Sequence, residues 1–152
     1  RGKPGCGSQG KRTVGENKMK VLLSIKPEYA NKIFNNEKRY EYRKTIFKRE
    51  VDRVIVYATK PVGKIIGEFF IEEIIQDEPR RLWKYTQKFS GISEDKFYEY
   101  FKNKSKGYAL KIGKVKPFRK PIDPKEMWGI FTPPQSFCYV DDDFLSNIVS
   151  RN

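Results

Sequence analysis

Hydrophobic and polar positions along the chain follow two different periods, and the first of them predicts β-strands. Short runs that alternate with period two, or that are almost continuously apolar, occupy residues 20–25, 39–43, 53–58, 63–75, 107–115 and 133–140. The run at 53–58 has nearly no polar interruption, which favours a strand in the centre of a sheet. Gly67 interrupts the run at 63–75 and predicts a bulge or bend there.

The second period, with apolar residues three or four apart, predicts helices. The segments with this spacing are 26–36, 78–89 and 93–104, and capping signals support shorter helices at 123–126 and 141–150. Pro27 suits a first helical turn, and Ser93 suits an N-cap. Asp123 and Glu126 have the spacing of a capping box.

The order of these elements shows no regular alternation of strand and helix and no repeat, which predicts one α+β domain. We expect a mixed, strongly curved sheet that closes into a small barrel, with flanking helices, over residues 19–152. Residues 1–18 hold five glycines and almost no apolar side chain, which predicts a flexible basic tail. Met19 is then a candidate for the natural start of the protein.

Charge and composition narrow the function classes. Lysine and arginine number 32 against 19 aspartates and glutamates, so the expected partner is anionic, with RNA or a nucleotide ahead of a membrane surface. The chain has no histidine, which excludes every catalytic arrangement that needs imidazole. Cys6 and Cys138 have no metal-ligand spacing, so we expect no metal and no cofactor. No signal peptide or membrane-spanning run is visible, and a cytoplasmic monomer is the expectation.

The strand at 39–43 raises the main chemical question. Glu41 and Arg43 share one face of it, while Tyr40 and Tyr42 share the other. An exposed ion pair on that face would contribute only about 0–1 kcal/mol and need have no function. In a cleft, Lys38 and Arg43 would instead offer donors for a phosphate or a base carbonyl, and Glu41 would accept from an exocyclic amine. Lys38 faces the same side only if the preceding turn rotates it.

Polar residues at other strand ends extend this candidate ligand-binding site. They lie after the first strand, after the third strand and before the last: Ser24, Lys26, Tyr57, Thr59, Lys60, Gln135 and Ser136. Trp83 and Trp128 offer surfaces on which bases stack, but tryptophans at such positions more often belong to the core.

The stretch LLSIKPEYANKIFNNEKRYEYRK resembles the ASCH family, small relatives of the PUA domain. That family carries a lysine, an acidic or hydroxyl residue and an arginine after its first helix, and these are Lys38, Glu41 and Arg43 here. The segments VYATKPVGKIIGEF and PPQSFCYV are similar to a longer bacterial branch labelled transcriptional regulators. The resemblance covers about residues 20–140. Asn36 replaces the glycine usual at the turn, and asparagine tolerates the left-handed backbone that such a turn needs.

The resemblance implies a PUA-like barrel with a cleft beside the first helix, in a module that binds RNA or a modified nucleotide. The alternatives are an amidohydrolase acting on an N4-acetylcytidine-like nucleobase, or a ribonuclease, with Lys38 and Glu41 as the candidate catalytic residues. The hydrolase branch has threonine where this chain has Glu41, which breaks the match to that chemistry. A role as a DNA regulator rests on the family label alone.

Overall fold

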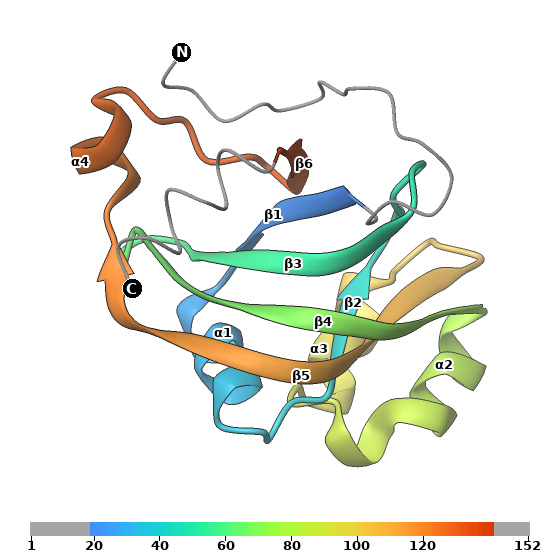
Figure 1. Ribbon diagram of the computed structural model, residues 1–152. Helices are drawn as coiled ribbons and strands as arrows, with labels where there is room; N and C mark the ends of the chain where they lie inside the picture. The colour runs from blue at the N-terminus through green and yellow to red at the C-terminus, as the bar shows by residue number, and fades with distance from the viewer. Residues whose placement is uncertain (1–18, 142–152) are drawn as a thin grey trace.

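A computed structural model describes residues 19–141, and it contains one six-stranded mixed sheet with the strand order β2-β5-β4-β3-β1-β6 (Figure 1). The strands are β1 (Met19–Ile25), β2 (Tyr40–Arg43), β3 (Val51–Ala58), β4 (Lys64–Asp77), β5 (Gly107–Ile122) and β6 (Phe137–Val140). The helices are α1 (Pro27–Phe34), α2 (Pro79–Thr86), the 3₁₀ helix η1 (Gln87–Phe89), α3 (Glu94–Tyr100) and α4 (Pro124–Trp128). The mixed α+β fold is the one that the sequence predicts.

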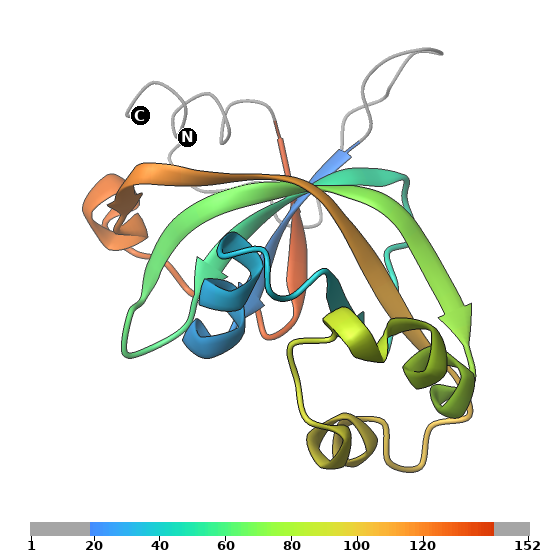
Figure 2. The ribbon, with the colours of Figure 1, turned by 90° about the horizontal axis from the view of Figure 1, so that it is seen from below.

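The sheet is open, so the predicted barrel is wrong. β1 pairs with β3 in parallel, the other neighbouring strands pair antiparallel, and β2 and β6 form the two edges. The sheet arches strongly, and α1 lies inside the arch (Figure 2). Ala30 and Ile33 of α1 are completely buried in the core beneath the strands. Among the described strands, β2 and β6 each pair with one neighbour only, so no backbone ladder closes the sheet.

Apolar side chains cover both faces of the sheet. On the inner face, Val54, Val56 and Phe69 pack with α1. On the outer face, Ile55 and Ile65 belong to a second cluster, against which Met127 and Trp128 of α4 pack. Because side chains along a strand alternate between faces, β3 contributes to both clusters, as its almost unbroken apolar run predicts.

Gly67 lies where the long strands bend, as the sequence predicts. The β3–β4 register shifts between Val56 and Tyr57, and the β4–β5 register shifts between Ile65 and Gly67. A Cβ atom at position 67 would lie 2.7 Å from the ring of Phe34 and from the carbonyl oxygen of Lys116. Glycine therefore allows α1 to approach the strand closely at this point.

The helices α2, η1 and α3 form one block between β4 and β5. Leu82 of α2, Phe97 of α3 and Phe101, which directly follows α3, pack against Tyr42 of β2, and the rings of Phe97 and Tyr42 meet edge to face at 4.9 Å. The Ser93 side chain accepts a hydrogen bond from the amide of Lys96, which confirms the predicted N-cap. This block forms a wall beside the short edge strand β2.

Several boundaries differ from the predicted ones. β5 continues through Pro117 and Pro121 to Ile122: both prolines are exposed, Pro117 lies opposite Gly67 at the border of the register shift, and Pro121 lies in the stretch that this shift leaves unpaired with β4. β6 begins at Phe137, after an irregular segment. The predicted tail at 1–18 and the predicted helix at 141–150 lie outside the described residues, apart from Asp141. Among residues 19–141, no helix has the length and apolarity required to cross a membrane.

Candidate functional site

A cavity of about 900 Å³ opens between the end of β1, the start of α1, β2, α3 and the segment that precedes β6. Eight of the ten predicted binding residues line it: Ser24, Lys26, Lys38, Glu41, Arg43, Thr59, Gln135 and Ser136. Tyr57 and Lys60 do not. Tyr57 points to the outer face and packs in the second core cluster, and Lys60 is exposed in the turn after β3. The predicted location in the cleft is wrong for these two residues.

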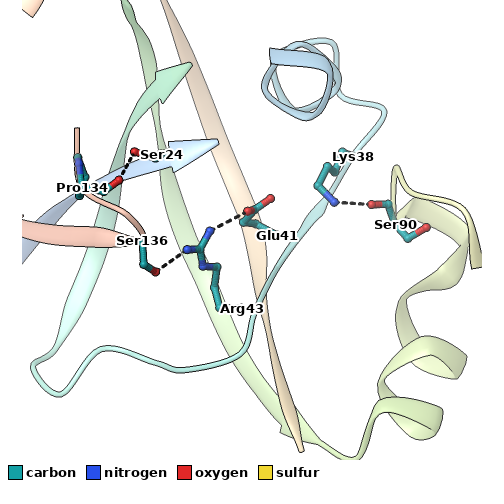
Figure 3. A network of polar contacts seen from close by, with 7 residues as sticks. All are labelled: Ser24, Lys38, Glu41, Arg43, Ser90, Pro134 and Ser136. Atoms are coloured by element: carbon teal, nitrogen blue, oxygen red, sulfur yellow. Dashed lines mark hydrogen bonds and ion pairs between the residues drawn. The ribbon is translucent and has the colours of Figure 1, made fainter. Parts of the chain in front are cut away.

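Arg43 is the centre of a polar network on one side of the cavity (Figure 3). Its Nη1 forms an ion pair with Oε2 of Glu41 at 3.3 Å, and its Nη2 donates to Oγ of Ser136 at 2.6 Å. Ser24 donates to the carbonyl oxygen of Pro134 at 2.7 Å and so fixes the segment that carries Ser136. The ion pair is largely buried, with only 12% of the Arg43 side chain and 10% of the Glu41 side chain exposed. It is therefore not a solvated surface pair.

Lys38 reaches the same cavity because the turn after α1 rotates it. Asn36 adopts the left-handed conformation, with φ of 65°, and the amide of Lys38 donates to the carbonyl oxygen of Lys32. The Nζ of Lys38 donates to the carbonyl oxygen of Ser90 at 2.6 Å (Figure 3). The sequence left open which way Lys38 faces, and the structure places it with Glu41 and Arg43.

The environment of Lys38 alters its protonation. Only 2% of the residue is exposed, and its Nζ lies 4.8 Å from the ring centre of Tyr42 and 5.3 Å from that of Tyr29. Burial is the main cause that lowers the pKa of Lys38, to a net value of about 8; the Glu41 carboxylate acts in the opposite direction, and nearby Lys32 adds a smaller lowering. Close to neutral pH, Lys38 is therefore mainly a cation that gives up its proton more readily than an ordinary lysine.

Aromatic rings add apolar surface to the cavity. Tyr29 and Tyr100 both line it, and burial raises the pKa of each phenol, so both stay neutral. The Nζ of Lys44 lies 4.6 Å from the centre of the Tyr100 ring. The sequence does not indicate either tyrosine as a site residue, because each belongs to the apolar stripe of a helix and this period predicts only core packing.

Basic side chains outnumber acidic ones around the cavity. Three further lysines that the sequence did not single out join the predicted residues: Lys44, Lys96 and Lys104. The acidic lining residues are Glu28, Glu41 and Glu99. Such a surface attracts anions, and the fixed donors of Arg43 suit a phosphate. Within residues 19–141, no three histidine, cysteine, aspartate or glutamate side chains gather in a way that would hold a metal ion.

The ASCH domain family model matches residues 23–118, and the chain belongs to this family. An ASCH domain-containing ribonuclease from Zymomonas mobilis is 31% identical over 134 residues, which are 86% of this chain and 90% of that protein. The crystal structure of ASCH from Zymomonas mobilis superimposes with a TM-score of 0.80 at 30% identity, over 86% of this chain and 94% of that one. The N-terminal domain of Staphylothermus marinus McrB, with a TM-score of 0.57 at 12% identity, covers 88% of this chain and 94% of its own and shares the fold alone.

Proposed function

We propose that this ASCH domain binds single-stranded RNA and places one nucleotide in the cavity beside α1. The observation that carries the proposal is the convergence of Lys38, Glu41 and Arg43 on one concave, mainly basic surface. The resemblance of the sequence to PUA-like proteins, which bind RNA, supports the same function. So does the similarity to a ribonuclease from Zymomonas mobilis over almost its whole length.

The donors and acceptors of the site suit a nucleotide. The guanidinium group of Arg43 has five N–H donors, and Glu41 and Ser136 engage two of its nitrogens, which leaves donors for a phosphate. The Glu41 carboxylate keeps lone pairs that can accept from an exocyclic amine of a base. Tyr29 and Tyr100 supply rings on which a base can stack.

RNA cleavage is a second candidate function, and the position of Lys38 favours it. The neutral form of Lys38 would accept the proton of a ribose 2′-hydroxyl, whose oxygen then attacks the adjacent phosphorus. The bond from phosphorus to the 5′-oxygen breaks, the leaving oxygen takes a proton from water, and a 2′,3′-cyclic phosphate remains. Arg43 would stabilise the charge that develops on the phosphate oxygens.

A salt titration tests the binding proposal. A fluorescein-labelled single-stranded RNA should bind more weakly as salt rises, with a slope of about −0.7 in log K against log[salt] for each phosphate contacted. Lys38→Met and Arg43→Gln should both weaken binding. Lys60→Gln removes one charge outside the cavity and is the matched control, for which we expect little change. Equal losses in all three variants, or an affinity that does not respond to salt, would remove the proposal.

The same samples separate binding from cleavage. Product with a 2′,3′-cyclic phosphate, formed by the wild type and not by Lys38→Met, would establish cleavage. Intact RNA after long incubation, together with salt-dependent binding, would leave the domain as a binding module.

A further inference from the structure

A stripe of basic and aromatic residues runs along the exposed side of α2 and η1, outside the cavity. Two rows with a spacing of four residues form it, and we call them together the α2 stripe: Arg80, Lys84 and Lys88 in one row, and Arg81, Tyr85 and Phe89 in the other. Residues four apart are neighbours on a helical surface, so each row is continuous. The opposite side of α2 carries the buried residues Leu82 and Thr86.

The α2 stripe is unusually exposed and carries one sign of charge. Tyr85 is 58% exposed and Phe89 is 45% exposed, although large aromatic side chains are generally buried. Residues 79–89 include four basic side chains and no acidic one. Within the described part of the chain, none of these four cations has an ion-pair or hydrogen-bond partner. The charges are therefore available to an anionic partner.

Three hydrogen bonds connect residues 89–91, at and just after the C-terminal end of the α2 stripe, to residues 32–39, and one of the donors is the cavity-lining Lys38. The carbonyl oxygen of Phe89 accepts from the amide of Arg39 at 2.8 Å, and that of Ser90 accepts from Nζ of Lys38 at 2.6 Å. The carbonyl oxygen of Gly91 accepts from Nζ of Lys32 at 3.3 Å. Ser90 directly follows Phe89, so the C-terminal end of the stripe is held next to Lys38, which lines the cavity.

We propose that the α2 stripe is a second contact surface for single-stranded RNA, which holds the nucleotides that continue from the one in the cavity. The proposal rests on the proposed function. Bases stack on Tyr85 and Phe89, and the parallel row of cations follows the phosphates, which is how strands are held without sequence preference. At a rise of about 1.5 Å per residue in α2 and 2.0 Å in η1, the stripe from Arg80 to Phe89 is at most about 16 Å long. It accommodates about five stacked nucleotides at 3.4 Å each.

A basic helix with an aromatic edge also suits an anionic membrane, but the structure favours RNA. Membrane-surface helices bury a broad apolar face in the lipid. The apolar face of α2 is already buried in the protein through Leu82 and Thr86, and only one row with two aromatic rings remains outside. The charge of the stripe and its junction with the cavity both fit a nucleic-acid strand.

The test compares a labelled trinucleotide, which fits the cavity alone, with a labelled 12-nucleotide single-stranded RNA of the same composition. One variant is Tyr85→Ala/Phe89→Ala, and a second is Lys84→Gln/Lys88→Gln. The control is Arg119→Gln/Lys125→Gln, which removes two exposed charges near α4, at the opposite end of the sheet from α2 (Figure 1, Figure 2). All substituted side chains are exposed, so melting temperatures should stay close to that of the wild type.

We expect the aromatic variant to bind the 12-mer at least about tenfold more weakly, since it loses two stacking rings and each stacked base is normally worth about fivefold or more. The lysine variant should show a salt slope that is shallower by about 1.4, which corresponds to two phosphate contacts. Neither variant should change the affinity for the trinucleotide, and the control should bind both RNAs as the wild type does.

An unchanged affinity for the 12-mer in both α2 variants would overturn the inference, as would equal losses in the lysine variant and the control. Loss of binding to vesicles of anionic phospholipid, with RNA binding intact, would overturn it in favour of a membrane surface. If the wild type binds the 12-mer through the stripe but never binds the trinucleotide, the cavity proposal fails and the stripe remains an RNA surface.

Discussion

Arg43 donates from Nη2 to Oγ of Ser136 at 2.6 Å, across 93 positions of sequence. Arg43 ends β2, one edge of the open sheet, and Ser136 directly precedes β6, the other edge. The same guanidinium group holds the Glu41 carboxylate. A side chain, not a ladder of backbone hydrogen bonds, therefore joins the two edges, and the cavity lies at this junction.

Substitution of Ser136 and substitution of Arg43 should lower the free energy of unfolding by different amounts. Ser136→Ala removes one hydrogen bond and should lower the free energy of unfolding by about 1 kcal/mol. Arg43→Ala also leaves the mostly buried Glu41 carboxylate without its ion-pair partner, and the expected loss is about 2 kcal/mol. Urea denaturation at pH 7 measures both.

A double-substitution cycle isolates the pair. Because Arg43→Ala leaves an uncompensated carboxylate, adding Glu41→Ala should recover part of the lost stability, so the two losses should not add. Simple additivity would show that Arg43 and Glu41 do not interact in the folded protein.

The fit between Gly91 and Lys38 should be sensitive to a single methyl group. A Cβ atom at Gly91 would lie 2.6 Å from Cβ of Lys38, and the backbone there has φ of +67°. Gly129 also has a positive φ, +78°, but no atom lies within 4 Å of its Cβ position. Gly129→Ala should cost about 1–3 kcal/mol through backbone strain alone. Gly91→Ala should cost about 1–3 kcal/mol more through overpacking.

The two alanine variants should also differ in RNA affinity. Gly91→Ala displaces Lys38 and should weaken binding, whereas Gly129→Ala should leave it intact. Thermal unfolding and anisotropy titrations on the same preparations check both statements, and equal effects of the two substitutions would contradict them.

The pKa of Lys38 predicts how stability depends on pH. Its folded value is about 8, against an ordinary value of 10.5, so between these two values the unfolded state binds more protons than the folded state. The contribution of Lys38 to the free energy of unfolding is therefore lowest below pH 8 and rises as pH increases toward 10.5. The wild type should gain up to about 3 kcal/mol over this interval relative to Lys38→Met, which has no titrating group there. A stability difference that stays flat or declines from pH 8 to pH 10 would show that burial does not lower this pKa.

Deacylation of N4-acetylcytidine should be slow or absent in the wild type. Within the family that the sequence resembles, the hydrolase branch has threonine at the position of Glu41, and a carboxylate there repels the oxyanion that forms during attack on an amide. Chromatography of reactions with wild type, Glu41→Thr and Lys38→Ala makes the comparison. Rapid turnover by the wild type, abolished in Lys38→Ala, would instead make this protein an amidohydrolase. Activity gained only in Glu41→Thr would identify a hydrolase scaffold adapted to binding.

Local patterns predicted most elements of the fold, because strand and helix periods reflect which side chains are buried. The open sheet could not be predicted in this way. Closure would require backbone pairing between β2 and β6, and tertiary packing decides whether strands so distant in sequence pair. The ends of β5 also escaped prediction, since Pro117 looks like a strand breaker until its place at a pairing irregularity is known.

Site residues at the ends of strands could be predicted from the sequence. Site residues whose orientation depends on tertiary contacts could not. Glu41 and Arg43 share a face by their spacing alone. The ammonium group of Lys38 is held at the cavity by a hydrogen bond to the carbonyl oxygen of Ser90, which lies 52 positions later in the sequence. Tyr57 does not line the cavity because side chains alternate along β3 and place it on the outer face of the sheet. The nearly continuous apolar run of β3 does not reveal which of its residues face inward and which face outward.

The most direct test of the account is a crystal structure of the domain with a single-stranded trinucleotide. We expect one nucleotide in the cavity, with a phosphate oxygen within about 3 Å of a guanidinium nitrogen of Arg43 or of Nζ of Lys38. A base should lie against Tyr29 or Tyr100. A trinucleotide bound elsewhere on the protein, with the cavity empty and Arg43 still paired only with Glu41 and Ser136, would contradict the proposal that this cavity is the RNA site.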